Sequence, residues 1–273
     1  MTRPQPTLRF ASFLGDNAFE FYRQVVGYLG AVTGLPTELV ATPADQTGLF
    51  ELGELEAAFA CGLPYVWQAA RADSPVRLLA APVLPEARYG GRPVYFADLI
   101  VHAASPYHSL AELRGTRFAY NQVTSMSGYV LPRYHLLMLG ESFDFFGATL
   151  ACGSHAHAMD WVEAGRVACA AIDSVVLAME LRQRPERAAS FRIVASMGPA
   201  AMPPVIVSAR LAPSVQAALT QALLNMHTQA DGQAILRQGG VRRFAPVSDA
   251  NYDDIRHMLT TIAAVDGANP PPG

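Results

Sequence analysis

Apolar stretches of strand length alternate with amphipathic stretches of helical length along most of the chain, and this alternation most constrains the fold. Strands are predicted at residues 8–14, 37–42, 57–62, 76–83, 94–103, 116–121, 146–153, 167–174, 191–197 and 203–211. Helices are predicted at 17–34, 47–57, 109–115, 128–140, 154–165 and within the long region 212–240. Strands that alternate with helices are typical of α/β proteins, in which helices cover the faces of the sheets.

The order of these elements suggests two lobes. Residues 102–192 contain a complete small α/β unit, and the residues before and after them look like parts of another one. We therefore predict a discontinuous lobe 1 at 7–101 plus 195–265, a lobe 2 at 102–194, and a disordered tail at 266–273. Chain crossings near residues 100 and 195 would leave a cleft between the lobes.

Composition excludes several classes of protein. The net charge is −3 and the sequence has no run of basic residues, which argues against a nucleic-acid partner. The three cysteines (61, 152 and 169) are an odd number without a CxxC motif, so we expect small buried side chains and neither a disulfide framework nor a metal site. No cofactor is predicted.

The location of the protein is left open by the sequence. No apolar stretch approaches the roughly 20 residues of a membrane span. The start, MTRPQPTLRF, lacks the apolar region of a secretory signal. The protein is therefore either cytoplasmic or the product of a removed leader.

The stretch NQVTSMSGYVLP (121–132) lies between a predicted strand and a predicted helix. The first turn of a helix has unpaired N–H groups and a partial positive charge, and it binds anions readily. The hydroxyls of Thr124, Ser125 and Ser127 would add donors, and Gly128 would let backbone and ligand approach closely. The alternative is simple helix capping by Ser125 or Ser127. The stretch lacks the GxxxxGK[ST] pattern that would indicate a nucleoside triphosphate.

A second strand–helix junction lies at Gly153, Ser154 and His155. A histidine ring N–H can donate to an anion, although a lone histidine is more often structural. His157 is two residues further on and cannot share a helix face with His155, so we expect it to be a solvent-facing or capping residue.

Several motifs together resemble a known family. They are S-x-S-G-Y-x-x-P at 125–132, GSH at 153–155, SLAELRG at 109–115, ACGLPYV at 60–66 and VYFADLIV at 94–101. In order and spacing they resemble the PhnD-like phosphate/phosphite/phosphonate substrate-binding proteins of ABC importers, over nearly the whole chain. The resemblance implies a monomer with the two-lobed type 2 periplasmic-binding-protein fold and the ligand between the lobes.

The resemblance also implies a set of binding residues. A serine-rich cradle would hold a tetrahedral oxyanion, with a histidine and a strand tyrosine as further donors: Ser125, Met126, Ser127, Gly128, His155 and Tyr95. Thr124 is a further candidate because it lies next to the cradle.

The sequence departs from the family pattern at several positions. Met126 stands where threonine is common, which removes a hydroxyl donor and adds an apolar side chain. The site would then either be weaker for an oxyanion or serve a ligand with an apolar face. Val176 and Pro203 fall where relatives that bind aminoalkyl phosphonates carry acidic residues, so such a ligand is disfavoured unless Asp173 substitutes. Gln46 falls where some members have tyrosine, and it could bond a ligand oxygen.

We therefore expect a solute-binding protein that closes about a hinge on phosphite, phosphate or an alkylphosphonate and delivers it to an ABC permease. This function implies a periplasmic protein. No catalytic residue is predicted, because no motif serine has a clear base with an orienting group, and no carboxylate pair is evident. The alternatives are a cytoplasmic ligand sensor or orphan binder, a thiamine-pyrimidine-synthase-like enzyme, and a cleft that binds nothing known.

Overall fold

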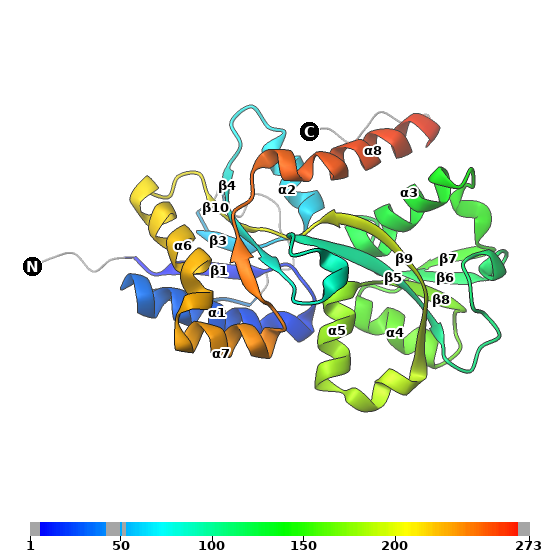
Figure 1. The fold of residues 1–273 in the computed structure, drawn as a ribbon. Helices are drawn as coiled ribbons and strands as arrows, with labels where there is room; N and C mark the ends of the chain where they lie inside the picture. The colour runs from blue at the N-terminus through cyan, green and yellow to red at the C-terminus, as the bar shows by residue number, and fades with distance from the viewer. Residues whose placement is uncertain (1–5, 42–49, 51–52, 267–273) are drawn as a thin grey trace, which may run out of the picture. The chain divides into compact units, whose positions relative to one another are not determined.

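The computed structural model describes residues 6–41, 50 and 53–266, and it divides into two compact units (Figure 1). Unit 1 holds the described residues up to Val94 together with Ala201–Asp253. Unit 2 holds Tyr95–Ala200 and the described residues from Asp254 onward. The described chain therefore passes between the units at three places, where the sequence predicted two.

The units differ from the predicted lobes in their boundaries. β5 (Val94–His102) and β9 (Phe191–Ala201) are strands of the unit 2 sheet. Two of the boundaries therefore lie at the start of β5 and at the end of β9. The helix α8 (Asp253–Asp266) falls almost entirely in unit 2 instead of lobe 1, where Arg133 of α3 (Leu131–Met138) donates to both carboxylate oxygens of Asp266 at 2.7 and 2.9 Å. Asp266, placed in the predicted tail, is the last residue of α8, and 267–273 lie outside the described residues.

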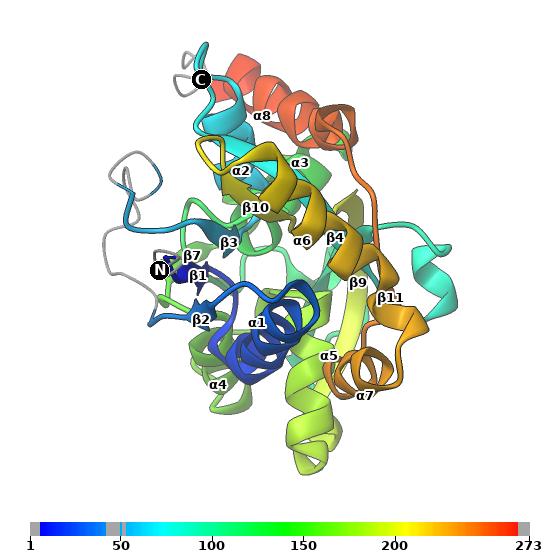
Figure 2. The same ribbon diagram turned by 90° about the vertical axis from the view of Figure 1, so that its left-hand side faces the viewer.

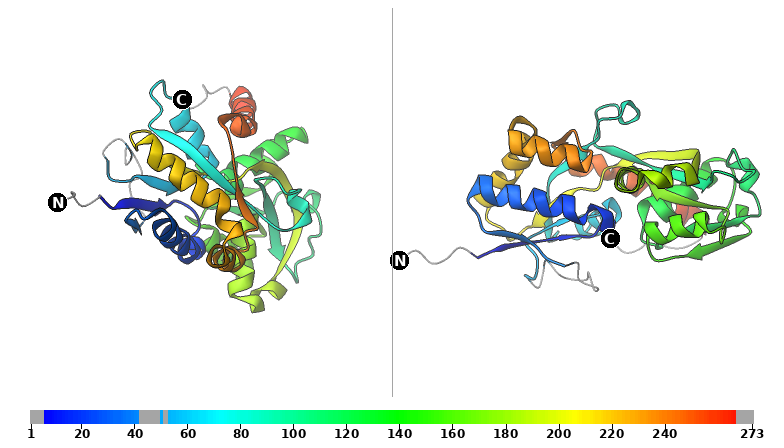
Figure 3. Two further views of the ribbon diagram at one scale, coloured as in Figure 1. Left: turned by 60° about the vertical axis from the view of Figure 1, so that its left-hand side comes forward. Right: turned by 90° about the horizontal axis from the view of Figure 1, so that it is seen from below.

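Unit 1 is built on a six-stranded mixed sheet with the order β11-β4-β10-β3-β1-β2. The strands are β1 (Leu8–Ser12), β2 (Thr37–Leu39), β3 (Ala57–Phe59), β4 (Val76–Val83), β10 (Val205–Ser208) and β11 (Arg243–Ala245). β1 runs parallel to β2 and β3, whereas β10 is antiparallel to β3 and β4. The helices are α1 (Phe19–Thr33), α2 (Gly62–Ala69), α6 (Pro213–Asn225) and α7 (Ala230–Gly239). α1 packs against α6 and α7, and the three lie side by side (Figures 2 and 3).

Unit 2 is built on a five-stranded mixed sheet with the order β7-β6-β8-β5-β9. β6 (Arg117–Tyr120) is parallel to β7 (Ala148–Ala151) and β8 (Cys169–Asp173), and β5 is antiparallel to β8. The carboxyl ends of β6, β7 and β8 therefore meet the amino end of β5 at one edge of the sheet. In open α/β sheets ligands bind outside the carboxyl ends of the strands, so this edge is where a site is expected.

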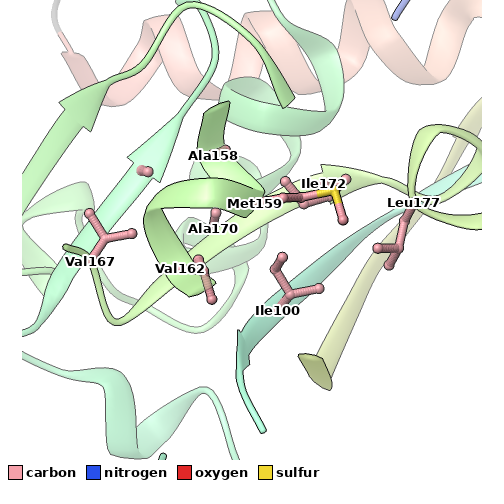
Figure 4. Packing of buried hydrophobic residues seen from close by; sticks show 9 residues of the cluster. Ile100, Ala158, Met159, Val162, Val167, Ala170, Ile172 and Leu177 are labelled. Atoms are coloured by element: carbon pink, nitrogen blue, oxygen red, sulfur yellow. The ribbon is translucent and has the colours of Figure 1, made fainter. Parts of the chain in front are cut away.

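Two helices cover one face of the unit 2 sheet. α4 (His155–Glu163) and α5 (Ser174–Gln183) bury apolar side chains against β5, β6 and β8 (Figure 4). The shared cluster consists of Ile100, Ala119, Ala158, Met159, Val162, Val167, Ala170, Ile172 and Leu177. Figure 1 shows α3 on the other side of the sheet.

A partly buried ion cluster ties α4 to α5. Arg187 donates to Glu180 of α5 at 2.6 Å and to Asp160 and Glu163 of α4, each at 2.8 Å. Both Arg187 and Glu180 are almost completely buried, so each depends on the other to offset the loss of hydration.

Local patterns predicted most elements, with clear exceptions. The strand at 76–83 is β4, and the helix at 17–34 is α1, which ends at Gly34 in the left-handed conformation. The helix predicted at 47–57 is wrong for its described residues 53–57, since Gly53 adopts a turn with φ of 72° and Ala57 begins β3. The helix at 109–115 is a short 3-10 turn, and α2, α5 and α8 were not predicted.

The 3-10 turns of the described chain are Asp16–Ala18, Ala87–Tyr89, Ala111–Leu113, Phe143–Phe145, Pro185–Ser190, Met226–Thr228 and Asp249–Tyr252. None of the helices in residues 6–41, 50 and 53–266 is long and apolar enough to cross a bilayer.

Candidate functional site

A helix begins at the serine-rich stretch that follows β6. Its first residues, Met126–Val130, form a π-helical turn that continues into α3. Ser125 is the N-cap: its Oγ accepts the Gly128 N–H at 3.0 Å, and its carbonyl accepts two further N–H groups of this turn. Capping, one of the two interpretations of the stretch, is therefore observed for Ser125. Its hydroxyl proton can still be donated, because the cap uses only a lone pair.

The first turn also presents backbone donors. The N–H groups of Met126 and Ser127 come before the first intrahelical bond, and no residue in the described chain accepts them. The Met126 side chain is fully buried and has no hydrogen-bond donor, so the backbone N–H is the group of this residue that can bind an anion. The Ser127 side chain is also buried, and its hydroxyl faces a histidine.

Gly128 is required by a close contact with Asn121. A Cβ added at Gly128 would lie 2.0 Å from Asn121 Oδ1 and 3.0 Å from Asn121 Cγ. Such distances are far shorter than van der Waals contact, so no larger residue fits without movement of the Asn121 carboxamide. The sequence suggested that Gly128 makes room for a ligand, and in this structure the group that approaches it is a side chain of the same unit.

His155 is the first residue of α4 and lies against the motif. Its Nε2 is 3.1 Å from Ser127 Oγ and 3.5 Å from Asn121 Nδ2. α4 is capped by Ser154, whose Oγ accepts the His157 N–H at 3.1 Å. Burial lowers the pKa of His155 to about 4, because the charged imidazolium is disfavoured away from water. At neutral pH the ring is therefore uncharged.

The Ser127–His155 contact bears on the expectation that no motif serine has a base with an orienting group. The structure places a neutral imidazole nitrogen within hydrogen-bond distance of Ser127 Oγ. A catalytic serine also needs a group that orients the histidine through its other nitrogen. His155 Nδ1 is buried and has no hydrogen-bond partner among the described residues. Within these residues, no side chain orients His155 as catalysis by Ser127 would require.

Two other candidates lie at the same edge of the sheet. Tyr95 is buried near the start of β5, which is separated from β6 by β8; this is a distance of about 10 Å between strand axes. Asp173 ends β8 and caps α5, where its Oδ1 accepts the N–H groups of Val175 at 2.7 Å and Val176 at 3.4 Å. The structure thus gives Asp173 a capping role that the sequence did not reveal.

Burial raises the pKa of Asp173 to about 7, helped by the nearby Asp98 and opposed by the two backbone N–H donors. A carboxyl group with this pKa is partly protonated at neutral pH. A role for Asp173 toward an ammonium group remains a prediction.

The remaining candidates stand apart from the cradle. Thr124 is exposed in the loop before the helix, and its hydroxyl lies 3.4 Å from Gln122 Oε1. Gln46 lies outside the described residues. His157 is exposed, and its Nδ1 lies 3.1 Å from the Cys152 carbonyl, which fits the expected solvent-facing position. No cluster of three or more His, Cys, Asp or Glu side chains in the described ranges could hold a metal ion.

Sequence reasoning missed Asn121. It was placed at the end of a predicted strand, and no role was assigned to it. The available signal was its position, since a polar side chain at the carboxyl end of a parallel strand lies at the edge where α/β proteins bind ligands.

Comparison with known proteins adds a family and a set of related folds. A family model described as the periplasmic substrate-binding protein of an ABC phosphonate transporter matches residues 11–252. PhnD1 from Prochlorococcus marinus, solved with methylphosphonate, is 18% identical with a TM-score of 0.80, over 95% of this chain and 99% of its own.

Two other solved structures are similar over comparable lengths. A binding protein component of an ABC phosphonate transporter from Pseudomonas aeruginosa is 18% identical with a TM-score of 0.80, over 96% of this chain and 88% of its own. A protein from Xanthomonas citri bound to ATP is 19% identical with a TM-score of 0.70, over 96% and 98%. The predicted fold, with two mixed sheets flanked by helices, is confirmed.

Proposed function

Because the chain belongs to the family of periplasmic substrate-binding proteins of ABC phosphonate transporters, we propose that it captures a small tetrahedral oxyanion for an ABC importer. Phosphite, phosphate and alkylphosphonates are the candidate ligands. The observation that carries the proposal is the Ser127–His155 pair, which lies at the first turn of the helix that starts at Met126.

The donors of this turn suit a tetrahedral anion. Backbone N–H groups of Met126 and Ser127 and the hydroxyls of Ser125 and Ser127 lie within one helical turn, where the helix dipole favours negative charge. The side chains that touch the turn, Asn121 and His155, are uncharged at neutral pH. The site would therefore hold an anion through hydrogen bonds and dipoles, with no salt bridge from these two residues.

The transport role follows from the family. We propose that the protein acts in the periplasm as a monomer, that binding changes the relative position of the two units, and that the loaded form docks on a permease. Transfer of a ligand requires no covalent chemistry. The site is in keeping with this, because His155 Nδ1 has no orienting partner among the described residues, as a catalytic serine–histidine pair would need. Tyr95 is proposed as a further hydroxyl donor to the anion.

The test is titration calorimetry on phosphate-free protein with methylphosphonate, phosphite, phosphate and, as a control anion, sulfate. We expect one phosphorus oxyanion to bind, and Ser127→Ala to weaken its binding by about 1–3 kcal/mol because a donor to a charged group is lost. Small-angle scattering with and without that anion tests the change between the units.

Ser142→Ala is a matched control, because Ser142 caps a 3-10 turn elsewhere in unit 2 through its Oγ. Its affinity should equal that of the unaltered protein. Failure of all the phosphorus anions to bind would refute the proposed function, and an unchanged affinity in Ser127→Ala would remove Ser127 from the site.

A further inference from the structure

The Asn121 side chain lies beside the proposed anion site. Its backbone carbonyl accepts the Gly153 N–H at 3.0 Å, which extends the pairing of β6 with β7 beyond the ends of both strands. Its carboxamide lies against the α carbon of Gly128, where a Cβ would have no room. From this position Nδ2 faces His155 Nε2 at 3.5 Å.

His155 Nε2 therefore faces two groups. A neutral imidazole carries one proton, so one ring nitrogen offers a single lone pair. Asn121 Nδ2 can only donate, which favours an unprotonated Nε2 with the ring proton on Nδ1. Ser127 Oγ is nearer, at 3.1 Å, and in the ligand-free protein its O–H is the better donor to that lone pair, because 3.5 Å is long for a hydrogen bond.

An oxyanion changes this arrangement. A ligand oxygen without a proton can only accept, so Ser127 must turn its single proton away from His155 to bind it. Nε2 would then be a buried acceptor without a donor, and leaving such a group unsatisfied is costly. Asn121 Nδ2 is the other donor that faces Nε2.

We propose that Asn121 is a positioning residue of the anion site: its amide N–H replaces the Ser127 O–H on His155 Nε2 when Ser127 donates its proton to the bound anion. The inference rests on the proposed function. It also specifies the ligand, because a ligand oxygen that carries a proton could donate to Ser127 and would not need this exchange. The fitting ligand is an anion that presents an unprotonated oxygen to Ser127.

Two measurements test the proposal. The first is the nitrogen-15 NMR spectrum of His155 in the ligand-free protein, which shows which ring nitrogen carries the proton. We expect an unprotonated Nε2 in the unaltered protein and in Asn121→Ala. In Asn121→Asp we expect a protonated Nε2, because a carboxylate there accepts and does not donate.

The second measurement is the dissociation constant of methylphosphonate by calorimetry. Asn121→Ala should raise it about tenfold, within the range expected when a buried polar group loses its partner. The matched control is Gln122→Ala, which removes an amide from the next, exposed position of the same loop, where Gln122 Nε2 lies 3.3 Å from the Gly153 carbonyl. This variant should bind like the unaltered protein.

Three results would contradict the proposed role of Asn121. A protonated Nε2 in the unaltered protein overturns the proposal, and this reading needs no variant to fold. Equal dissociation constants for Asn121→Ala and Gln122→Ala overturn it as well, while the proposed function stands. No binding of methylphosphonate, phosphite or phosphate by the unaltered protein refutes the proposed function together with the inference.

Discussion

Two buried groups at the edge of the unit 2 sheet should give the protein opposite dependences of stability on pH. The pKa of His155 is lowered to about 4 by burial, from 6.5. The folded state therefore binds fewer protons than the unfolded state between these values, and stability falls as the pH drops from 6.5 to 4. At 1.36 kcal/mol per pKa unit, this loss is about 3 kcal/mol.

Asp173 acts in the other direction. Burial raises its pKa from 3.8 to about 7, with a further contribution from Asp98. The folded state binds the extra proton, so this stabilisation is complete below pH 3.8 and disappears as the pH rises to 7. The loss is about 4 kcal/mol. The contributions of Asp173 and His155 nearly cancel between pH 4 and 7.

The perturbation that separates them is Asp173→Asn. Asparagine keeps the shape of the side chain and is a good N-cap, so α5 should persist. The difference in unfolding free energy, unaltered protein minus Asp173→Asn, should fall by about 4 kcal/mol from pH 4 to pH 7. For His155→Gln the same difference should rise by about 3 kcal/mol over this range.

The assay is urea unfolding at several pH values, followed by the fluorescence of Trp161 in a Trp67→Phe background. Trp161 lies in α4, the helix that His155 begins, and therefore reports on the unit that contains both groups. If the difference in unfolding free energy between the unaltered protein and each variant does not change with pH, the proposed pKa shifts of Asp173 and His155 are refuted.

Two further variants test contacts near the site. Gly128→Ala places a Cβ 2.0 Å from a side-chain oxygen, so we expect a loss of about 1–3 kcal/mol in urea unfolding and weaker anion binding. Gly27→Ala in α1, where nothing lies within 4 Å of the new Cβ, should lose no stability; equal behaviour of the two would contradict the reasoning. Arg187→Gln removes the buried cationic partner of the buried Glu180 and should cost about 3–5 kcal/mol by the same assay. Arg184→Gln removes an exposed partner of Glu180 and should cost less than about 1 kcal/mol. Similar losses in these two variants would count against a stabilising buried cluster.

The sequence predicted elements whose signals are local. The strand β4 is a continuous apolar run, and α1 has helical spacing and a glycine stop at Gly34. α2 was missed because it starts at Gly62 without a capping side chain, so no start signal marks it. α5 was missed because its cap, Asp173, was read only as a possible ligand group.

The site was predictable only where its signals are local in the sequence. A strand, a serine-rich turn and a helix in succession suggest a cap or an anion cradle, and Ser125 could be placed at the helix start. The Ser127–His155 contact joins residues 28 positions apart through the parallel pairing of β6 with β7. The contact between Asn121 and Gly128 depends on side-chain conformation in the folded unit, which no spacing rule contains.

Met126 shows why a departure from a family pattern has to be judged from the fold. Read as sequence, a methionine in place of threonine suggested either a weaker oxyanion site or a ligand with an apolar face. Burial does not separate the two interpretations, because Met126 is fully buried and the proposed ligand residues Ser127 and His155 are buried as well. The donors that remain do separate them. Loss of one hydroxyl leaves the Ser125 cap, the Ser127–His155 pair and the backbone N–H groups in place, and these groups suit an anion. The retained donors therefore favour weaker binding of the same class of anion over a change of ligand class.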